Sequence, residues 1–216
     1  MFKAVVFDFD GTMLDTETVW YDSFRETLAE HDIDLPLEVF AHGIGTYDDS
    51  LFRYITDKMG SEDGLEDVKR RAFAKHHEKA ATLPLRDGVE DYLKDASRLG
   101  LRIALATSSP YPWVESFLTS HGLMHYFETL CTKDDVAQVK PDPELYTLSV
   151  RRLGIEPHEA VAFEDSANGA KAAVAAGLRC VIVPNPVTEA LHFEKYDMRI
   201  GSMKELSLEE LLLKLS

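Results

Sequence analysis

From about residue 84 onward, short apolar segments alternate strictly with segments of helical periodicity. The apolar segments have the length and composition of buried strands, and glycine or proline marks the ends of several helical segments. Strands that are joined by helical crossovers lie parallel, and helices then cover both faces of the sheet. We therefore predict an α/β fold with a doubly wound parallel sheet. The expected strands have the sequences FKAVVFDF, LRIALA, FETLCT, AVAF and RCVIVP.

Residues 16–83 have a different sequence pattern. They are rich in charged residues, have helical periodicity and contain no convincing strand. Trp20, Phe24 and Leu28 recur at a spacing of four residues, which is typical of one face of a helix. Residues 50–60 and 65–81 are two further helix candidates. We predict a small all-helical cap over residues 16–83, inserted after the first strand of a core domain at residues 1–15 and 84–216. The hinges are expected near residues 15–16 and 83–86.

The charge balance excludes several classes of partner. The 216 residues carry 23 Lys and Arg against 38 Asp and Glu, a net charge of -15, and no basic run occurs. Nucleic acid and anionic membrane surfaces are therefore not expected as partners. No segment approaches the ~20 apolar residues of a membrane span, and the N-terminal apolar stretch is too short for a signal peptide.

The two cysteines, Cys131 and Cys180, both lie in apolar, strand-like segments. Such cysteines are typical of reduced core residues, so we expect a cytoplasmic protein. The sequence leaves the oligomeric state open.

Polar residues follow three of the expected strands. Ligands of an open parallel sheet bind beyond the carboxyl ends of its strands, so these residues are candidates for one crevice. The polar residues after any one strand could form a turn or cap a helix. Turns and caps alone, however, do not explain why such residues follow all three strands. A lysine at the start of a helix precedes the last of these strands. The candidates are Asp8, Asp10, Thr107, Ser108, Ser109, Lys140, Glu164 and Asp165.

The carboxylates predict a cation. Four carboxylates within a few ångströms repel one another by kcal/mol amounts, and oxygen ligands suit Mg²⁺. We therefore predict Mg²⁺ as the cofactor. The expected metal residues are Asp8, Asp10, Glu164 and Asp165.

The order of the polar residues predicts phosphoryl transfer. Asp8, ionised at neutral pH, can attack phosphorus and form an aspartyl-phosphate. Asp10 lies two residues further along the strand, where it can protonate the leaving oxygen and later deprotonate the attacking water. Thr107, Ser108 and Lys140 would share the charge on the transferring phosphoryl group.

The segments DFDGT, IALATSS, VKPDPELY and AFEDSANG resemble, in order, the four motifs of the haloacid dehalogenase-like hydrolases. The helical insert resembles the small cap of the subgroup that contains β-phosphoglucomutase and phosphoglycolate phosphatase. The resemblance implies that Asp8 is the nucleophile and a Mg²⁺ ligand, and that Asp10 is the acid and base whose backbone carbonyl also binds the metal. It further implies a phosphate-holding pair, Thr107 and Lys140, and an acidic metal pair, Glu164 and Asp165.

Departures from the family pattern favour one reaction. Sugar mutases of this subgroup have a histidine in the first cap helix and an arginine in the cap loop, where this chain has Trp20 and Tyr47. These replacements remove the residues suited to retaining a bisphosphate intermediate, so a phosphatase is favoured over a phosphomutase. Dehalogenation is disfavoured by Asp10, because the dehalogenating relatives lack this second aspartate and need no metal.

A receiver-like phospho-aspartate signalling domain is an alternative from another class. Such domains also combine acidic residues, a hydroxyl residue, a lysine and Mg²⁺. In them, however, the acidic pair ends the first strand and the phosphorylated aspartate comes later, which is the reverse of the order here.

The cap carries weaker candidates for substrate specificity. Trp20 and Tyr47 occupy the positions that differ from the mutases, although Trp20 also fits a plain cap core with Phe24. Lys75 and Lys79 lie four residues apart on one helix and could meet an anionic substrate. Adjacent histidines at 76 and 77 are interpreted as part of a solvated helix face. We predict a Mg²⁺-dependent phosphatase of a small phosphorylated metabolite, whose identity the sequence does not specify.

Overall fold

The computed structural model describes residues 1–41, 44 and 50–216. Within them, six strands form one sheet in the order β3-β2-β1-β4-β5-β6, and every neighbouring pair is parallel. The chain starts in the middle of the sheet and builds outward on both sides, so the doubly wound α/β fold is confirmed. The strands are β1 (Ala4–Phe7), β2 (Arg102–Ala106), β3 (Thr129–Cys131), β4 (Ala160–Glu164), β5 (Arg179–Ile182) and β6 (Met198–Arg199).

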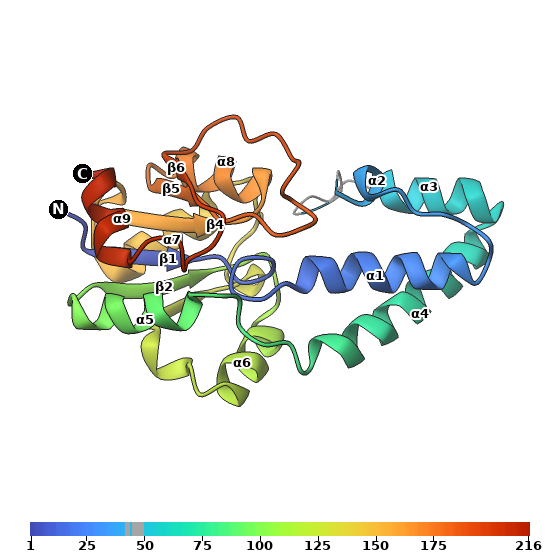
Figure 1. Cartoon of the computed structure of the whole chain (residues 1–216), viewed down its shortest axis with the longest axis horizontal. Coiled ribbons are helices and arrows are strands. Elements are labelled where there is room, and N and C mark those ends of the chain that lie inside the picture. The colour runs from blue at the N-terminus through green and yellow to red at the C-terminus, as the bar shows by residue number, and fades with distance from the viewer. Residues whose placement is uncertain (42–43, 45–49) are drawn as a thin grey trace.

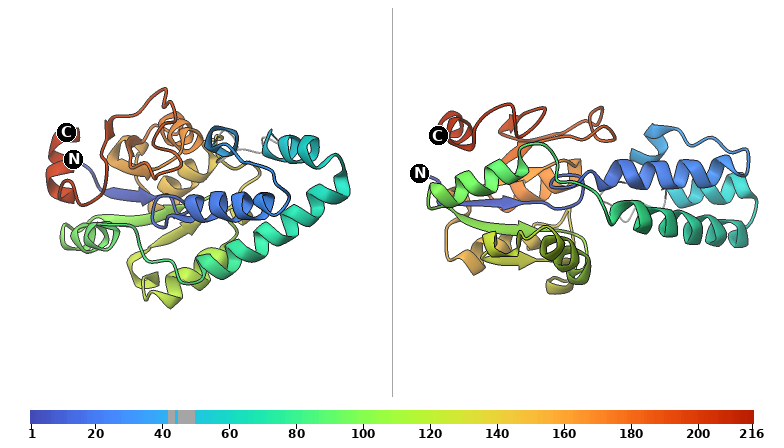
Figure 2. Two further views of the ribbon diagram at one scale, coloured as in Figure 1. Left: turned by 45° about the vertical axis from the view of Figure 1, so that its right-hand side comes forward. Right: turned by 60° about the horizontal axis from the view of Figure 1, so that its bottom comes forward.

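Helices cover both faces of the sheet, as Figures 1 and 2 show. Successive side chains of a strand point to opposite faces, so Val5 and Phe7 join one buried cluster whereas Ala4 and Val6 join another. The first cluster is covered by α5 (Val89–Arg98), α6 (Tyr111–Ser120) and α9 (Leu208–Leu215), and the second by α7 (Glu144–Leu153) and α8 (Ala167–Ala175). Short 3-10 turns occur at Met124–Tyr126, Lys133–Asp135 and Pro157–Glu159.

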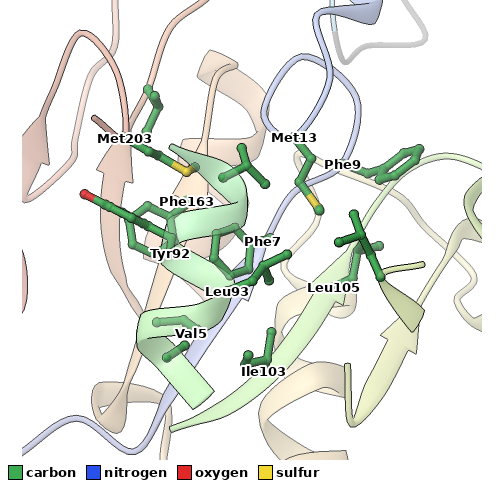
Figure 3. Packing of buried hydrophobic residues seen from close by; sticks show 14 of the residues in the cluster. Val5, Phe7, Phe9, Met13, Tyr92, Leu93, Ile103, Leu105, Phe163 and Met203 are labelled. Atoms are coloured by element: carbon green, nitrogen blue, oxygen red, sulfur yellow. The ribbon is translucent and has the colours of Figure 1, made fainter. Parts of the chain in front are cut away.

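Aromatic packing fixes the central strand that carries the site. Phe7 of β1 stacks on Phe163 of β4 with ring centroids 5.1 Å apart, and Tyr92 of α5 meets the same ring edge-on at 5.3 Å (Figure 3). Such pairs add about 0.5–1.5 kcal/mol to the stabilisation from burial. The carboxyl ends of β1 and β4 are therefore held side by side.

Between β1 and α5, the regular elements that the structure describes are helices. These helices are α1 (Thr16–Ala29), α2 (Leu37–Ala41), α3 (Ser50–Met59) and α4 (Glu62–Ala80). They stand beyond the carboxyl ends of the strands, with α1 packed along α4 (Figures 1 and 2). These helices enclose an apolar cluster of their own, which includes Phe24, Leu28, Ile55 and Val68. The arrangement fits the predicted cap, and domain boundaries at residues 15/16 and 83/84 remain our proposal.

Contacts within the core fix the chain where it returns from the cap, and a further contact joins the cap to α8. The guanidinium of Arg86 donates hydrogen bonds to the backbone carbonyls of Gly11, Val183 at 2.9 Å and Pro184 at 2.6 Å. On the other side, the side-chain amide of Asn168 in α8 donates to the carbonyl of Ile44 at 3.2 Å. The return of the chain into the core is thus fixed to the ends of two strands.

Most sequence expectations for single elements are close to the structure. The capping box that starts the last helix is present between Ser207 and Glu210, and Gly60 follows α3 with a positive φ of 71°. Both Cys131 and Cys180 are buried and unpaired. The short elements α2 and β6 are not predicted from the sequence.

The two ends of the chain lie near each other. Figure 1 shows them at the end of the sheet that points away from the cap helices, and residues of both ends, Met1 and Ser216 among them, line one shallow hollow. Among the described helices, none combines the length and the apolar character needed to cross a membrane.

Candidate active site

Lys140 lies at the centre of the site. Its ammonium nitrogen is 2.5 Å from Oδ1 of Asp8 and 2.5 Å from Oε1 of Glu164, and its side chain is only 4% exposed. Burial disfavours the charged lysine, but the two carboxylates outweigh burial and raise the pKa of Lys140 above its usual range. The lysine is therefore a permanent positive charge next to Asp8.

Glu164 is held by protein donors on both oxygens. The hydroxyl of Tyr146 donates to Oε1 at 2.5 Å, beside the bond from Lys140, and the hydroxyl of Ser166 donates to Oε2 at 3.3 Å. A β-carbon at Gly169 would lie 1.9 Å from Oε2, so only glycine leaves room for this carboxylate against α8. Glu164 thus has the contacts of a residue that orients Lys140.

Asp165 is held between two loops. Its Oδ1 accepts a hydrogen bond from the Thr12 hydroxyl at 3.3 Å, and its Oδ2 accepts one from the Asn185 amide at 2.7 Å. Gly11 approaches so closely that a β-carbon there would lie 2.1 Å from Oδ2, and its φ of 81° also favours glycine. The glycine of the DFDGT motif therefore makes room for a carboxylate from the far end of the sequence.

Three carboxylates of the site suit a metal ion. Oxygen atoms of Asp8, Glu164 and Asp165 all lie within 4.8 Å of one another, and all three residues are buried. Burial raises the pKa of Asp8 to about 7, despite the opposing charge of Lys140, and raises that of Asp165 well above its usual range. One lysine does not neutralise three carboxylates, so a hard divalent cation such as Mg²⁺ fits the residues present.

The Asp10 carboxylate is separate from this group. It accepts hydrogen bonds from the Ser109 hydroxyl at 2.5 Å and from the indole N–H of Trp113 at 3.1 Å. Burial raises the pKa of Asp10, whereas these two hydrogen bonds oppose the rise. Its carboxyl group is therefore held by Ser109 and Trp113, apart from the three clustered carboxylates.

Thr107 and Ser108 follow β2 at the same edge of the sheet. The Thr107 hydroxyl oxygen accepts a hydrogen bond from the backbone N–H of Ser109 at 3.0 Å. The Ser108 hydroxyl is buried and has no hydrogen-bond partner within the described parts of the chain. A buried hydroxyl without a partner is costly, so this group has the character of a binding group for an oxygen-rich ligand.

A cavity of about 410 Å³ opens over these residues. We use the name core wall for the part of its lining that comes from the core domain. The core wall consists of Asp8, Asp10, Thr107, Ser108, Ser109, Pro110, Trp113, Lys140, Asp165 and Ser166. We use the name cap wall for the part of its lining that comes from residues 16–83. The cap wall consists of Glu17, Trp20, Ile44, Phe73, His76 and His77.

Stacked rings form much of the cap wall. The ring of Trp20 stacks on that of His76 with centroids 3.6 Å apart and an interplanar angle of 9°, and it meets Phe73 edge-on at 4.7 Å. His76 is only 7% exposed, and burial lowers its pKa to about 4. The prediction of a solvated face is therefore wrong for His76, because Trp20 covers its ring. His77 is exposed, as predicted.

The remaining cap candidates fall elsewhere. The ammonium group of Lys79 pairs with Glu26 on α1 at 2.7 Å, and that of Lys75 pairs with Glu30, the residue after α1, at 2.8 Å. Neither lysine lines the cavity. The structure therefore does not bring them to the site. Tyr47 lies outside the described residues.

Sequence reasoning missed several residues of the site. Asn185 follows β5, so the rule that polar residues gather at strand ends could have found it. Tyr146 and Trp113 lie on helices among apolar neighbours and give no comparable signal. Glu17 lies in the first turn of α1, where an acidic residue is ordinary.

The chain belongs to the haloacid dehalogenase-like hydrolases, because the sequence pattern of that family matches residues 5–183. The predictions of the family, of the fold class and of an enzyme are thereby confirmed. Among curated relatives, "Putative phosphatase YhcW" of Bacillus subtilis is 48% identical over 216 residues, covering 98% of this chain and 97% of the relative. The "Phosphorylated carbohydrates phosphatase" of Thermotoga maritima is 29% identical, covering 97% and 96%.

Solved structures agree with this assignment. CbbY from Rhodobacter sphaeroides in complex with phosphate is 32% identical, covers 95% of this chain and 96% of its own, and has a TM-score of 0.75. The "putative beta-phosphoglucomutase" from Thermotoga maritima is 26% identical with a TM-score of 0.76, covering 98% of this chain and 99% of its own.

Proposed function

We propose that this chain is a Mg²⁺-dependent phosphatase that hydrolyses a small phosphorylated carbohydrate through an aspartyl-phosphate. The observation that carries the proposal is the Lys140 ammonium group, which lies between Asp8 and Glu164 beside three clustered carboxylates. The names of relatives support the substrate class. They include the phosphatase of Thermotoga maritima and the Escherichia coli "Hexitol phosphatase B", which is 29% identical over 216 residues.

Asp8 acts as the nucleophile in this proposal. Lys140 favours its ionised form, so that one carboxylate oxygen attacks phosphorus while the leaving oxygen departs on the opposite side. The same ammonium group and the Ser108 hydroxyl bind phosphoryl oxygens as negative charge develops on them. Thr107 orders the turn that presents these groups, because its hydroxyl binds the backbone of that turn.

Asp10 moves the protons. It gives a proton to the leaving oxygen in the first step and takes one from water in the second, when water attacks the aspartyl-phosphate. Its hydrogen bonds from Ser109 and Trp113 hold the carboxyl at the floor of the cavity, where the leaving group must lie.

Asp8 and Asp165 would hold the metal through their side chains, with the backbone carbonyl of Asp10. Glu164 belongs to the same carboxylate cluster, and it also orients Lys140, whose ammonium group donates a hydrogen bond to its Oε1. When bound, Mg²⁺ neutralises part of the carboxylate charge and polarises the phosphoryl group.

A phosphomutase is the second candidate, supported by the likeness to a structure titled as a β-phosphoglucomutase. The ring of Trp20 argues against it, because it occupies the place of the mutase histidine and packs on His76 and Phe73. Membership of the hydrolase family removes the reason to prefer a receiver-like signalling domain.

The test is a panel of sugar and polyol phosphates assayed for phosphate release with Mg²⁺ and after its removal. We expect Mg²⁺-dependent release of phosphate from at least one of them. Isomerisation of β-glucose 1-phosphate is measured in parallel. Isomerisation faster than phosphate release would favour the mutase, and release that survives exhaustive chelation would contradict the metal requirement.

A further inference from the structure

We propose that His76 is a specificity-determining residue of the cap wall, whose imidazole forms a hydrogen bond with a hydroxyl group of the leaving alcohol. This inference rests on the proposed phosphatase function and adds to it a residue that recognises the leaving group. It starts from a buried imidazole nitrogen in the lining of the cavity that lacks a hydrogen-bond partner within the described parts of the chain.

His76 stands in an otherwise apolar row of α4. Buried residues recur along this helix every three or four positions, as expected of a helix that packs along α1. The other buried members of the row are Leu65, Val68, Ala72 and Ala80. A polar ring in such a row costs free energy unless its nitrogens are hydrogen-bonded. The packing of α4 therefore does not explain why residue 76 is a histidine.

The Nε2 atom of His76 is buried, and no residue that the structure describes forms a hydrogen bond with it. The residue as a whole is 7% exposed and belongs to the lining of the cavity. Buried polar atoms without a partner are rare in folded proteins, because they have lost their hydrogen bonds to water and gained none in return. A molecule that binds in the cavity is the partner that would supply the missing bond.

The protonation state of the ring indicates the chemistry of this partner. Burial, followed by the charge of His77, lowers the pKa of His76 to about 4, so the imidazole is neutral near pH 7. A neutral imidazole has one N–H donor and one acceptor nitrogen, and Nε2 is either of them depending on the tautomer. A hydroxyl group both donates and accepts, so it pairs with Nε2 in both tautomers. An ionised carboxylate only accepts, and it gains no charge attraction from a neutral ring.

Two tryptophans restrain the ring of His76. Trp20 covers one face, with centroids 3.6 Å apart and an interplanar angle of 9°, and Trp113 approaches from the core with its centroid 5.9 Å away. A restrained ring loses little freedom when a hydrogen bond to it forms. Because Asp8, Lys140 and His76 line one cavity of about 410 Å³, a phosphate held at the core wall places its leaving group in the space that His76 borders.

Two esters with the same six-carbon chain test the proposal. Sorbitol 6-phosphate carries hydroxyl groups along the chain, whereas hexyl phosphate carries none. His76→Phe keeps an aromatic ring beside Trp20 and removes both nitrogens. We expect this variant to lower kcat/KM for sorbitol 6-phosphate about tenfold and to change kcat/KM for hexyl phosphate by less than about twofold. An equal change for both esters would overturn the proposal.

His76→Gln separates hydrogen bonding from packing. The amide of Gln can donate and accept near the place of Nε2, but it cannot stack on Trp20 as a ring does. We expect His76→Gln to retain more activity toward sorbitol 6-phosphate than His76→Phe, and the opposite order would mean that His76 acts through packing alone. His121→Phe is the matched control and should leave both esters unaffected. His121 also stacks on an aromatic ring, that of Phe117 at 3.8 Å, but it does not line the cavity.

Binding can also be followed without turnover. In Asp8→Asn, nitrogen NMR of the histidine rings should show a shift of the His76 Nε2 signal when sorbitol 6-phosphate and Mg²⁺ are added, and a much smaller shift with hexyl phosphate. The signal is assigned by its absence when His76→Phe is combined with Asp8→Asn. Equal shifts with the two esters would contradict the hydrogen bond.

Acetyl phosphate separates this inference from the proposed function, because its leaving group is too small to reach the cap wall. If the wild type released phosphate from none of the three compounds, the phosphatase function itself would be wrong. If it hydrolysed acetyl phosphate and hexyl phosphate but not sorbitol 6-phosphate, the function would stand and the role of His76 would be wrong.

Discussion

The two walls of the cavity are built in different ways. On the core wall, most polar side chains are bound by another side chain, and Lys140 joins Asp8 of the wall to Glu164 in one bonded group. On the cap wall, stacked rings provide the surface, and the carboxyl of Glu17 has no protein partner among the described residues. Side chains that hydrogen-bond to one another can adopt few arrangements, so the core wall tolerates few substitutions. Packed rings have weaker directional requirements, so the cap wall tolerates more. We therefore expect the core wall to determine the reaction and the cap wall to determine the substrate.

The largest effect is expected from Asp8→Asn. The amide is close in shape to the carboxylate but is a poor nucleophile, so kcat should fall about a thousandfold or more for every ester, small or large. Phosphate release by the purified variant measures the change. Circular dichroism should show a folded protein, because Lys140 keeps its bond to Glu164. If Asp8→Asn retained a tenth of the wild-type kcat, Asp8 would not be the nucleophile.

Removal of divalent cations should act next most strongly. Chelation should lower phosphate release from all esters by about a hundredfold or more, and added Mg²⁺ should restore it. Binding can be checked without activity, since Mg²⁺ should raise the melting temperature of the wild type. Asp165→Asn should abolish this rise and Glu26→Gln should keep it. A rise of equal size in Asp165→Asn would show that the metal binds elsewhere.

Trp20→Ala tests the cap wall. Loss of the ring removes surface that a large leaving group contacts, so kcat/KM for sorbitol 6-phosphate should fall about tenfold. Acetyl phosphate should be affected much less, because its leaving group does not reach the cap. Trp20→Phe, which keeps an aromatic face, serves as the control for packing. If Trp20→Ala lowered the activity toward sorbitol 6-phosphate and acetyl phosphate equally, the assignment of substrate selection to the cap wall would be wrong.

The smallest effect concerns stability and pH at His76. Burial lowers its pKa from 6.5 to about 4, so the unfolded chain binds a proton between these values while the folded chain does not. The free energy of unfolding therefore falls as pH decreases below about 6.5, by roughly 1 to 2 kcal/mol at pH 5.

His76→Phe should reduce this pH dependence while it retains a ring against Trp20. Urea unfolding at pH 7.5 and pH 5 measures the difference between variant and wild type. The same loss of stability in both proteins would mean that His76 is not the group responsible.

The sequence predicts the core wall well for a physical reason. A buried charge needs a partner, so residues such as Asp8 and Lys140 are restricted to few arrangements and leave recognisable motifs. The alternation of strands and helices then brings the motifs to one edge of the sheet. Asn185 obeys the same rule after β5, although no motif marks it.

The cap wall could not be predicted to the same degree. Apolar residues along one side of a helix indicate that this side is buried, but not which residues cover it. Trp20 was therefore compatible both with packing inside the cap and with contact to the substrate. The burial of His76 depends on the packing of α4 against α1, which are far apart in the sequence. Lys75 and Lys79 were candidates only because their glutamate partners on α1 could not be foreseen.

The shared position of the two chain ends has a practical consequence. Because both ends lie at the edge of the sheet opposite the cap helices, a tag, a fluorophore or a surface linker can be attached at either end without covering the cavity (Figure 1). An enzyme tethered in this way would present its cap to the solution. A dye pair with one label near an end and the other on an exposed site of α3 would then report the distance between cap and core in single molecules.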